Sequence, residues 1–236
     1  MAAFQGEKFI AAQLASILVQ LSEADEVIVV DDCSADRTRD VVRRMADSRV
    51  RLLEHAVNQG VTKTFEDALT QATGEVIFLS DQDDLWAADK VQSILDIFQS
   101  QRDVVVAASN AALIGQSGQS LGRSYYQLRG QFRSGLLSNL IRCKFLGCTM
   151  AFRSELLPKV LPFPRTFQVL HDLWIGSVNS LTGGRTFFLD QNLVLYRRHP
   201  DSVTAGKLKT GSRLKNRLHH LGAVGTYWLT SMMGSR

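Results

Sequence analysis

The chain has 236 residues, of which 45% are apolar, so it can bury the core of one large or two small domains, and a disordered chain is excluded. It has neither an apolar run of the roughly 18 residues that cross a bilayer nor a basic, then apolar, secretory signal at its start. Its three cysteines lack zinc-ligand spacing, which favours a reducing compartment, and we expect a cytoplasmic protein.

The net charge of +4 is concentrated at the C-terminus. From residue 202 onward the chain has no acids and six basic residues, namely Lys207, Lys209, Arg213, Lys215, Arg217 and Arg236. A basic tail on a slightly acidic body suits an anionic membrane surface at least as well as nucleic acid. Leu214, Leu218 and Leu221 would share one face of a helix there, which either contacts the inner leaflet or packs on the domain.

The first predicted element is a helix after Gly6. Its apolar residues recur with the 3.6-residue period of a helix with one buried face, at Ile10, Leu14, Ile17, Leu18 and Leu21. A first strand would normally precede this helix, but the chain begins too late to supply one. We therefore expect a sheet that lacks its first strand, or a sequence that is short at its N-terminus.

Strands and helices then alternate three times, which predicts a parallel sheet covered on both faces. The strands are expected at residues 26–30, 50–53 and 75–79. Asp31 and Asp32 end one of these strands, while Asp81 and Asp83 follow another. Because ligands bind beyond the carboxyl ends of such strands, we expect the two acidic groups to face the same crevice.

Three carboxylates, those of Asp81, Asp83 and Asp84, are crowded directly after the third strand. Crowded carboxylates repel one another, so they usually stay in water or hold a cation. Mg²⁺ and Mn²⁺ prefer oxygen ligands and often share them with substrate phosphates. The alternative is a purely structural acidic turn, in which Asp83 or Asp84 caps the helix near Lys90.

The second half is less regular. We expect a strand at 104–108, a long loop at 115–135, a strand at 147–152, a helix from His171, and a hairpin of strands at 186–189 and 193–196. The hairpin ends in Arg197, Arg198 and His199. Taken alone, Asp172 is equally well read as a helix N-cap acid and His199 as a solvated loop residue.

Taken together, these motifs resemble the family-2 glycosyltransferases of the GT-A fold. The series is Asp31-Asp32-Cys33-Ser34-Ala35-Asp36-Arg37-Thr38, Asn58-x-Gly60, Gly74-Glu75-x-Ile77-x-Leu79-Ser80-Asp81-Gln82-Asp83-Asp84-x-Trp86, His171-Asp172-x-Trp174 and Tyr196-Arg197-x-His199. Within that family the chain is most similar to bacterial rhamnosyltransferase-like enzymes of surface-polysaccharide synthesis. It departs from the family pattern at Phe4-Gln5, where Tyr-Asn is usual.

The resemblance implies an α/β fold with a mixed, mainly parallel sheet flanked by helices. The GT-A domain would span residues 1–206, divided into a nucleotide-binding half (1–110) and an acceptor and catalytic half (111–206), with 207–236 as the amphipathic tail. The implied donor is a nucleoside-diphosphate sugar, dTDP-rhamnose or a UDP-sugar. The implied acceptor is a glycan or lipid-linked oligosaccharide, with no role for nucleic acid.

The resemblance also implies roles for single residues in donor binding. Asp32 would hydrogen-bond the nucleobase, with Asp31 beside it, and Asp81 would lie near the ribose. Asp83 and His199 would bind Mg²⁺ or Mn²⁺ on the donor diphosphate. Lys63 would help to hold the nucleotide in place.

The remaining implied roles concern the acceptor. Asp172 would be the catalytic base of a direct displacement, which inverts the anomeric centre. Gly147, Cys148 and Trp174 would line the acceptor side.

Two other functions remain open at this stage. A nucleotidyltransferase also uses paired acids and a metal, but it usually carries a Gly-rich, basic phosphate loop near the N-terminus, and this sequence shows none. A noncatalytic sugar-nucleotide-binding or scaffold protein, derived from a truncated copy, would keep the nucleotide residues without needing Asp172.

Overall fold

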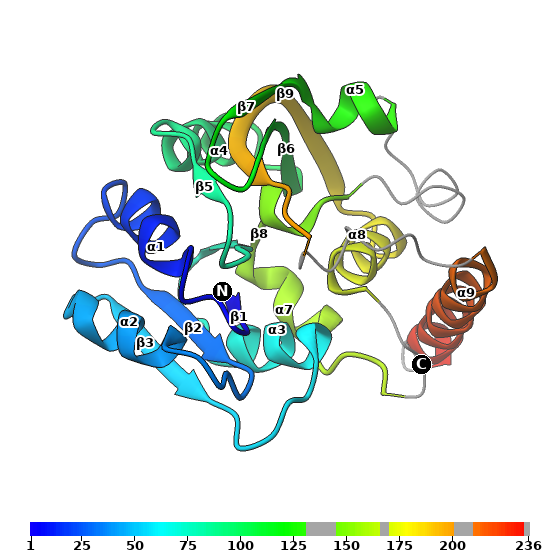
Figure 1. The fold of residues 1–236 in the computed structure, drawn as a ribbon. Helices are drawn as coiled ribbons and strands as arrows, with labels where there is room; N and C mark the ends of the chain where they lie inside the picture. Colours follow the sequence, from blue (N-terminus) through cyan, green and yellow to red (C-terminus); the bar gives the residue numbers. More distant parts are fainter. Residues whose placement is uncertain (131–144, 166–169, 201–209, 234–236) are drawn as a thin grey trace.

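The structure is a computed structural model that describes residues 1–130, 145–165, 170–200 and 210–233. Its first half is a three-stranded parallel sheet with helices packed against it (Figure 1). The strands lie in the order β1 (Ala2–Ala3), β2 (Val27–Asp31) and β3 (Val50–Glu54). The helices are α1 (Ile10–Leu18), α2 (Thr38–Met45) and α3 (Val61–Thr70). The predicted alternation of strands and helices in this half is confirmed.

The expectation that the first strand is missing is wrong. Ala2 and Ala3 form β1, which pairs in parallel with Val30 and Asp31 of β2. On its other side, the amide of Ala2 donates to the carbonyl oxygen of Ser80 at 3.3 Å, and Ala2 forms a bridge with Asp81. A strand of two residues shows no alternation, so its sequence carries no recognisable period. β1 brings the acidic loop to the edge where β2 ends.

The second half is a six-stranded sheet in the order β4-β8-β6-β9-β5, with β7 also paired to β6. Its strands are β4 (Val76–Phe78), β5 (Leu85–Trp86), β6 (Val104–Ile114), β7 (Ser120–Ser124), β8 (Met150–Arg153) and β9 (Arg185–Arg197). Among the described strands of this sheet, β6 and β9 pair in parallel and the other pairs are antiparallel. The mixed α/β fold is therefore confirmed. Fewer strand pairs are parallel than a mainly parallel sheet would have, because the pairs of the second sheet are mostly antiparallel.

Two local predictions in this half are wrong. The expected hairpin is the single strand β9, in which Leu189 pairs with Ser109 and Asn192 with the next residue, Asn110. The polar residues between them bulge out of the ladder without reversing the chain, and bulges are hard to tell from turns by composition. The loop expected at 115–135 contains β7 and the helix α5 (Tyr125–Arg129) before the described residues end at 130.

The remaining helices cover the second sheet or follow it. They are α4 (Lys90–Ser100), the 3₁₀ turns η1 (Gly147–Thr149) and η2 (Ser154–Leu156), α7 (Leu157–Val160), α8 (His171–Leu181) and α9 (Thr210–Met233). The largest core cluster includes Phe65 of α3, Met150 and Phe152 of β8, and Ile175 of α8. Each such side chain contributes about 1.5–3 kcal/mol when it is buried. This packing fixes α8 over the sheet.

The predicted C-terminal helix is present as α9, but it packs through another face than the leucine face. Ala223 and Val224 join the core, and the Tyr227 ring meets Trp174 edge-on at 5.7 Å between centroids. Leu218 and Leu221 are exposed, so they do not pack on the domain as the structural alternative required. The side chain of Leu214 and the boundary expected at 206–207 lie outside the described residues. Within the described ranges, no helix combines the length and the apolar character that a membrane crossing demands.

Candidate active site

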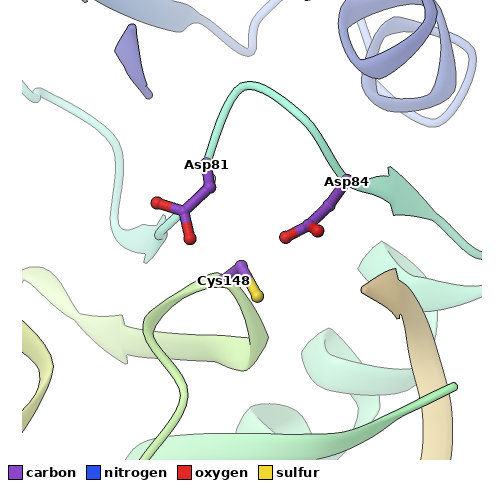
Figure 2. A group of neighbouring side chains, drawn as sticks. All are labelled: Asp81, Asp84 and Cys148. Carbon is purple, nitrogen blue, oxygen red and sulfur yellow. The ribbon is translucent and has the colours of Figure 1, made fainter. Parts of the chain in front are cut away.

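The acidic loop between β4 and β5 lies over the turn η1 (Figure 2). Asp81 and Asp84 stand at the two ends of the loop and, with Cys148, place ligand atoms within 4.8 Å of one another. Burial, followed by repulsion from the Asp83 charge, raises the pKa of Asp84 to about 7. Burial, followed by the charges of Asp84, Asp83 and Asp172, holds the pKa of Asp81 well above its usual range. This group of acids has the character of a cation site.

The two residues predicted to bind the metal lie in direct contact. The Nε2 atom of His199 is 2.8 Å from Oδ2 of Asp83. The His199 ring also packs at a tilt on Phe9, with 5.1 Å between ring centroids. A carboxylate and an imidazole at hydrogen-bonding distance are a fitting donor pair for a divalent cation of the Mn²⁺ type. The structure thus brings together Asp83 and His199, which are 116 positions apart.

Lys90, the first residue of α4, is fully buried and contacts η1. Its ammonium group donates to the carbonyl oxygen of Cys148 at 2.7 Å and lies 4.0 Å from the centroid of the Trp86 ring. Burial lowers the pKa of Lys90 to about 7, and burial raises the pKa of the Cys148 thiol. A neutral thiol is a poor metal ligand, and a neighbouring ammonium repels a dication. The pair of Asp83 and His199 is therefore better suited to an ion than the side of Asp84 and Cys148.

Asp172 lies in the first turn of α8 and is half-buried. Its Oδ1 atom accepts from the amide of Leu173 at 2.7 Å, and its charge acts on Asp81. The neighbouring His171 points into the core and stacks on Phe65 with 3.9 Å between ring centroids. Burial lowers the pKa of His171, so its imidazole is neutral at pH 7. Asp172 is consequently the ionisable group that α8 offers to the acidic loop.

The three residues predicted on the acceptor side occupy different environments. Gly147 lies against His171, because a Cβ atom there would stand 2.6 Å from the His171 Nε2 atom. Cys148 is buried beside the acids. Trp174 is a core residue, 3% exposed, whose indole donates to the carbonyl of Val160 at 2.9 Å. The structure therefore keeps Gly147 and Cys148 near the site and places Trp174 behind it.

The Asp32 side chain, at the end of β2, binds the turn that precedes α3. Its Oδ1 atom accepts from the amide of Gln59 at 2.7 Å and contacts His55 Nδ1 at 2.8 Å, while Oδ2 accepts from the amide of Gly60 at 2.8 Å. Gly60 has φ +85°, a conformation that favours glycine. Asp32 thus organises the turn that faces the predicted nucleobase site.

Asp31 has a different environment from Asp32. It is completely buried, accepts from the amide of Ser34 at 2.9 Å, and forms an ion pair with the Arg39 Nε atom at 3.1 Å. These contacts hold the loop between β2 and α2. Asp31 therefore has a structural position behind the predicted nucleotide site, with its contacts made inside the protein.

Lys63 does not reach the acidic loop directly. Its ammonium forms ion pairs with Glu66 and Asp67 on its own helix, and the hydrogen bond to Asp67 raises the pKa of Lys63. Asp67 in turn contacts His55 Nε2 at 3.1 Å, and His55 contacts Asp32. Lys63 is therefore linked to the predicted nucleobase residue through two intermediates.

Sequence reasoning missed His55, Lys90 and the role of Arg197. Arg197 carried a signal, because it belongs to the motif Tyr196-Arg197-x-His199. His55 and Lys90 carried none, because an isolated histidine after a strand and a lysine at a helix start are normally solvated. Their importance becomes visible only through burial and contacts.

Comparison with known proteins identifies the family of this chain and several relatives. The family model described as Glycosyl transferase family 2 matches residues 1–161. An uncharacterized glycosyltransferase of Nostoc sp. is 29% identical over 203 residues, covering 81% of this chain and 61% of the relative. The putative teichuronic acid biosynthesis glycosyltransferase TuaG of Bacillus subtilis is 26% identical, and the match covers 89% of this chain and 82% of TuaG. The dTDP-rhamnosyl transferase RfbG of Shigella flexneri is 25% identical, and the match covers 97% of this chain and 80% of RfbG. The chain thus spans about three fifths of the Nostoc relative.

Solved structures show the same fold. TarS of S. aureus, in complex with UDP-GlcNAc, has a TM-score of 0.69 at 21% identity and covers 88% of this chain and 60% of its own. The mannosyltransferase PcManGT from Pyrobaculum calidifontis, in complex with GDP-Man and Mn²⁺, has a TM-score of 0.62 at 20% identity. The match covers 94% of this chain and 61% of the PcManGT chain. At such identities the likeness establishes the fold alone, and it is the predicted GT-A fold.

Proposed function

Because the chain belongs to glycosyl transferase family 2, we propose that it transfers a sugar, with inversion, from a nucleoside-diphosphate donor to a polysaccharide or lipid-linked acceptor. The observation that carries the proposal is the contact between Asp83 and His199 at the same sheet edge as Asp32. A nucleotide held at the end of β2 would extend its diphosphate towards this pair. Asp172 would then lie on the side from which an acceptor approaches.

The donor half of the proposal rests on Asp32, Asp81 and Asp83. We assign the nucleobase to the turn that the Asp32 carboxylate holds at the end of β2, and the ribose to Asp81, which is bridged to β1. The structural neighbours bind a uridine and a guanosine nucleotide sugar, and one relative is named for dTDP-rhamnose. We propose dTDP-rhamnose or a UDP-sugar as the donor of this chain.

Asp83 and His199 would hold a divalent cation, Mg²⁺ or Mn²⁺, against the donor diphosphate. Bound there, the ion supplies positive charge to the departing nucleoside diphosphate. The single imidazole in this donor pair favours Mn²⁺, because Mg²⁺ prefers an all-oxygen shell. Arg197 adds fixed positive charge at the loop through its bond to the carbonyl oxygen of Asp83, whereas Lys90, whose pKa burial lowers to about 7, donates to the carbonyl oxygen of Cys148.

The transfer itself is assigned to Asp172. Its carboxylate takes the proton of the acceptor hydroxyl as that oxygen forms a bond to the anomeric carbon and the bond to the diphosphate oxygen breaks. Both electrons of the broken bond leave with the diphosphate. One displacement from the opposite face inverts the anomeric centre, and no covalent sugar-enzyme intermediate is needed.

Two measurements test the proposal. The first is a thermal-shift screen of nucleotide sugars with and without Mn²⁺, in which a stabilising donor identifies the nucleotide. The second compares sugar transfer by the wild type, Asp172→Asn and the control Asp89→Asn, whose side chain is exposed near the start of α4. Asp172→Asn should lower the rate by about 10²- to 10⁴-fold while donor binding persists, and Asp89→Asn should not. Donor binding without transfer by the wild type would favour the noncatalytic alternative.

We also propose that α9 contacts the cytoplasmic leaflet of the membrane that carries the acceptor. Large apolar side chains are exposed at helical spacing along it, namely Leu218, Leu221, Trp228 and Leu229. They lie on another face than Ala223 and Val224, which pack on the domain. An apolar stripe beside a basic, acid-free segment fits an anionic lipid surface.

Liposome flotation tests the membrane contact. The protein should float with vesicles that contain anionic lipid and lose most of that binding in the double variant Leu221→Gln/Trp228→Gln. Thr226→Gln, an exposed position off the stripe, is the matched control and should bind like the wild type. Equal flotation of all three proteins would contradict the contact.

A further inference from the structure

We propose that Asp84 and Arg197 are positioning residues that join the acidic loop to the end of β9 and hold Asp83 and His199 at metal-binding distance before any ligand arrives. This inference rests on the proposed function, because it concerns the same site. It assigns a role to two residues that contact neither sugar nor nucleotide in the proposed arrangement.

The two segments are joined by reciprocal hydrogen bonds. Oδ1 of Asp84 accepts from the backbone amide of Arg197 at 2.9 Å. In return, Nε of Arg197 donates to the backbone carbonyl oxygen of Asp83 at 2.7 Å. Each side chain therefore binds the main chain of the opposite segment. Asp84 adjoins Asp83, and Arg197 stands two positions before His199, so the bonds fix the main chain that carries both donors.

Arg197 extends the connection to a third segment. Its guanidinium also donates to the carbonyl oxygens of Gly115 and Gln116, at 3.3 and 2.9 Å, in the turn that follows β6. The same guanidinium lies 4.9 Å from the centroid of the Phe9 ring, which also contacts the His199 ring. The position of His199 is thus defined from its main chain and from its ring face.

Burial makes these bonds effective. Asp84 is 1% exposed and Arg197 is 6% exposed, so water does not compete for their hydrogen bonds. Two metal donors on separate, unconnected segments would have to lose conformational freedom when the ion binds. Donors that are already held together avoid that loss, which is the general benefit of preorganisation.

An ordinary structural role for the pair makes a different prediction. If Asp84 only satisfied a buried amide, its loss would lower stability without a specific effect on metal affinity. If it positions the donors, the folded variant must bind the ion more weakly. The amide oxygen of asparagine can still accept from the Arg197 amide, so Asp84→Asn should restore most of what Asp84→Ala loses.

The test measures Mn²⁺ alone, by electron paramagnetic resonance, on the full chain without donor. Asp84→Ala should weaken Mn²⁺ binding by about 10- to 100-fold, the range seen when groups that orient metal ligands are removed. Asp84→Asn and the exposed control Asp89→Ala should stay close to the wild type. Arg197→Lys keeps the charge and the backbone amide but loses the planar fork, so it should also weaken binding. If Asp84→Ala does not fold, the Mn²⁺ affinity of Arg197→Lys tests the inference in its place.

A second readout separates this inference from the proposed function. The His199 ring signals in a nitrogen-edited NMR spectrum should shift or broaden in Asp84→Ala and stay near the wild type in Asp84→Asn. Folded Asp84→Ala and Arg197→Lys proteins with unchanged His199 signals and unchanged Mn²⁺ affinity would overturn the inference. A wild type that binds Mn²⁺ but transfers no sugar would contradict only the proposed function.

Discussion

The Nε2 atom of His199 lies 2.8 Å from the Oδ2 atom of Asp83, across 116 positions of sequence. The reason is the antiparallel pairing of β5 with β9, in which Leu85 lies opposite Leu195 and Trp86 opposite Val194. Residues just before β5 then lie near residues just after Leu195. The pairing of the two-residue strand β5 with β9 therefore assembles the proposed metal site.

Replacement of either Asp83 or His199 should weaken both metal binding and sugar transfer. Asp83→Asn and His199→Ala are each expected to weaken Mn²⁺ binding and to lower sugar transfer by roughly 100-fold or more, because a direct ligand is worth more than the groups that orient it. Isothermal titration with Mn²⁺ and a transfer assay check this. Asp96→Asn, on the exposed face of α4, is the control. Full transfer by His199→Ala at limiting Mn²⁺ would contradict the assignment.

The contacts of His55 predict an effect on nucleotide affinity. His55→Phe removes the hydrogen bond to Asp32 and should lower both donor affinity and stability, the latter by about 1–3 kcal/mol. Lys63→Met, which removes only the ion pairs to Glu66 and Asp67, should have the smaller effect on donor affinity. Titration of both variants with a nucleoside diphosphate checks the order. A larger loss in Lys63→Met would mean that Lys63 touches the nucleotide directly.

Close packing at Gly147 predicts a coupled loss of stability and activity. In Gly147→Ala the new Cβ would meet His171 Nε2 at 2.6 Å, so the ring at the start of α8 must move and Asp172 with it. We expect a destabilisation of about 1–3 kcal/mol and a lower kcat. Gly74→Ala is the matched control, because its Cβ would make only an ordinary contact at 3.6 Å. Equal unfolding midpoints for the two variants would refute the prediction.

Acid should loosen the docking of α9 through His220. This histidine is 3% exposed, its Nε2 atom lies 3.0 Å from the Ser177 hydroxyl, and burial lowers its pKa to about 4. A lowered folded pKa means that the unfolded chain binds the proton more readily. The stability linked to neutral His220 is therefore complete above pH 6.5 and is lost as the pH falls towards 4, by at most about 3 kcal/mol.

The measurement is urea unfolding at several pH values, with hydrogen exchange of α8 and α9 as the local readout. His220→Gln should remove this part of the pH dependence. Asp84 works in the opposite direction, because its raised pKa adds stability as the pH falls below about 7. The difference between wild type and His220→Gln isolates the histidine. Identical pH profiles for the two proteins would disprove its role.

Much of the site was predictable because its signals are local. An apolar strand followed by Asp81, Asp83 and Asp84 predicts both a sheet edge and a cation, and strand alternation predicts that Asp32 faces the same edge. The prediction failed for β1, where two residues show no period, and for β9, where a polar bulge resembles a turn. These errors arose where local pattern and final pairing differ.

By itself, therefore, the sequence determined the type of fold and the acids at the strand ends, because both depend on residue types at short spacing. Only the tertiary structure decided which groups those acids meet. The contacts of Asp83 with His199 and of Asp84 with Arg197 depend on the register of β5 against β9. The burial of Lys90 at the start of α4 depends on its contact with Cys148 of η1, which is 58 positions away. Such contacts follow from packing across the whole chain, since pairing register and burial are properties of distant segments in combination.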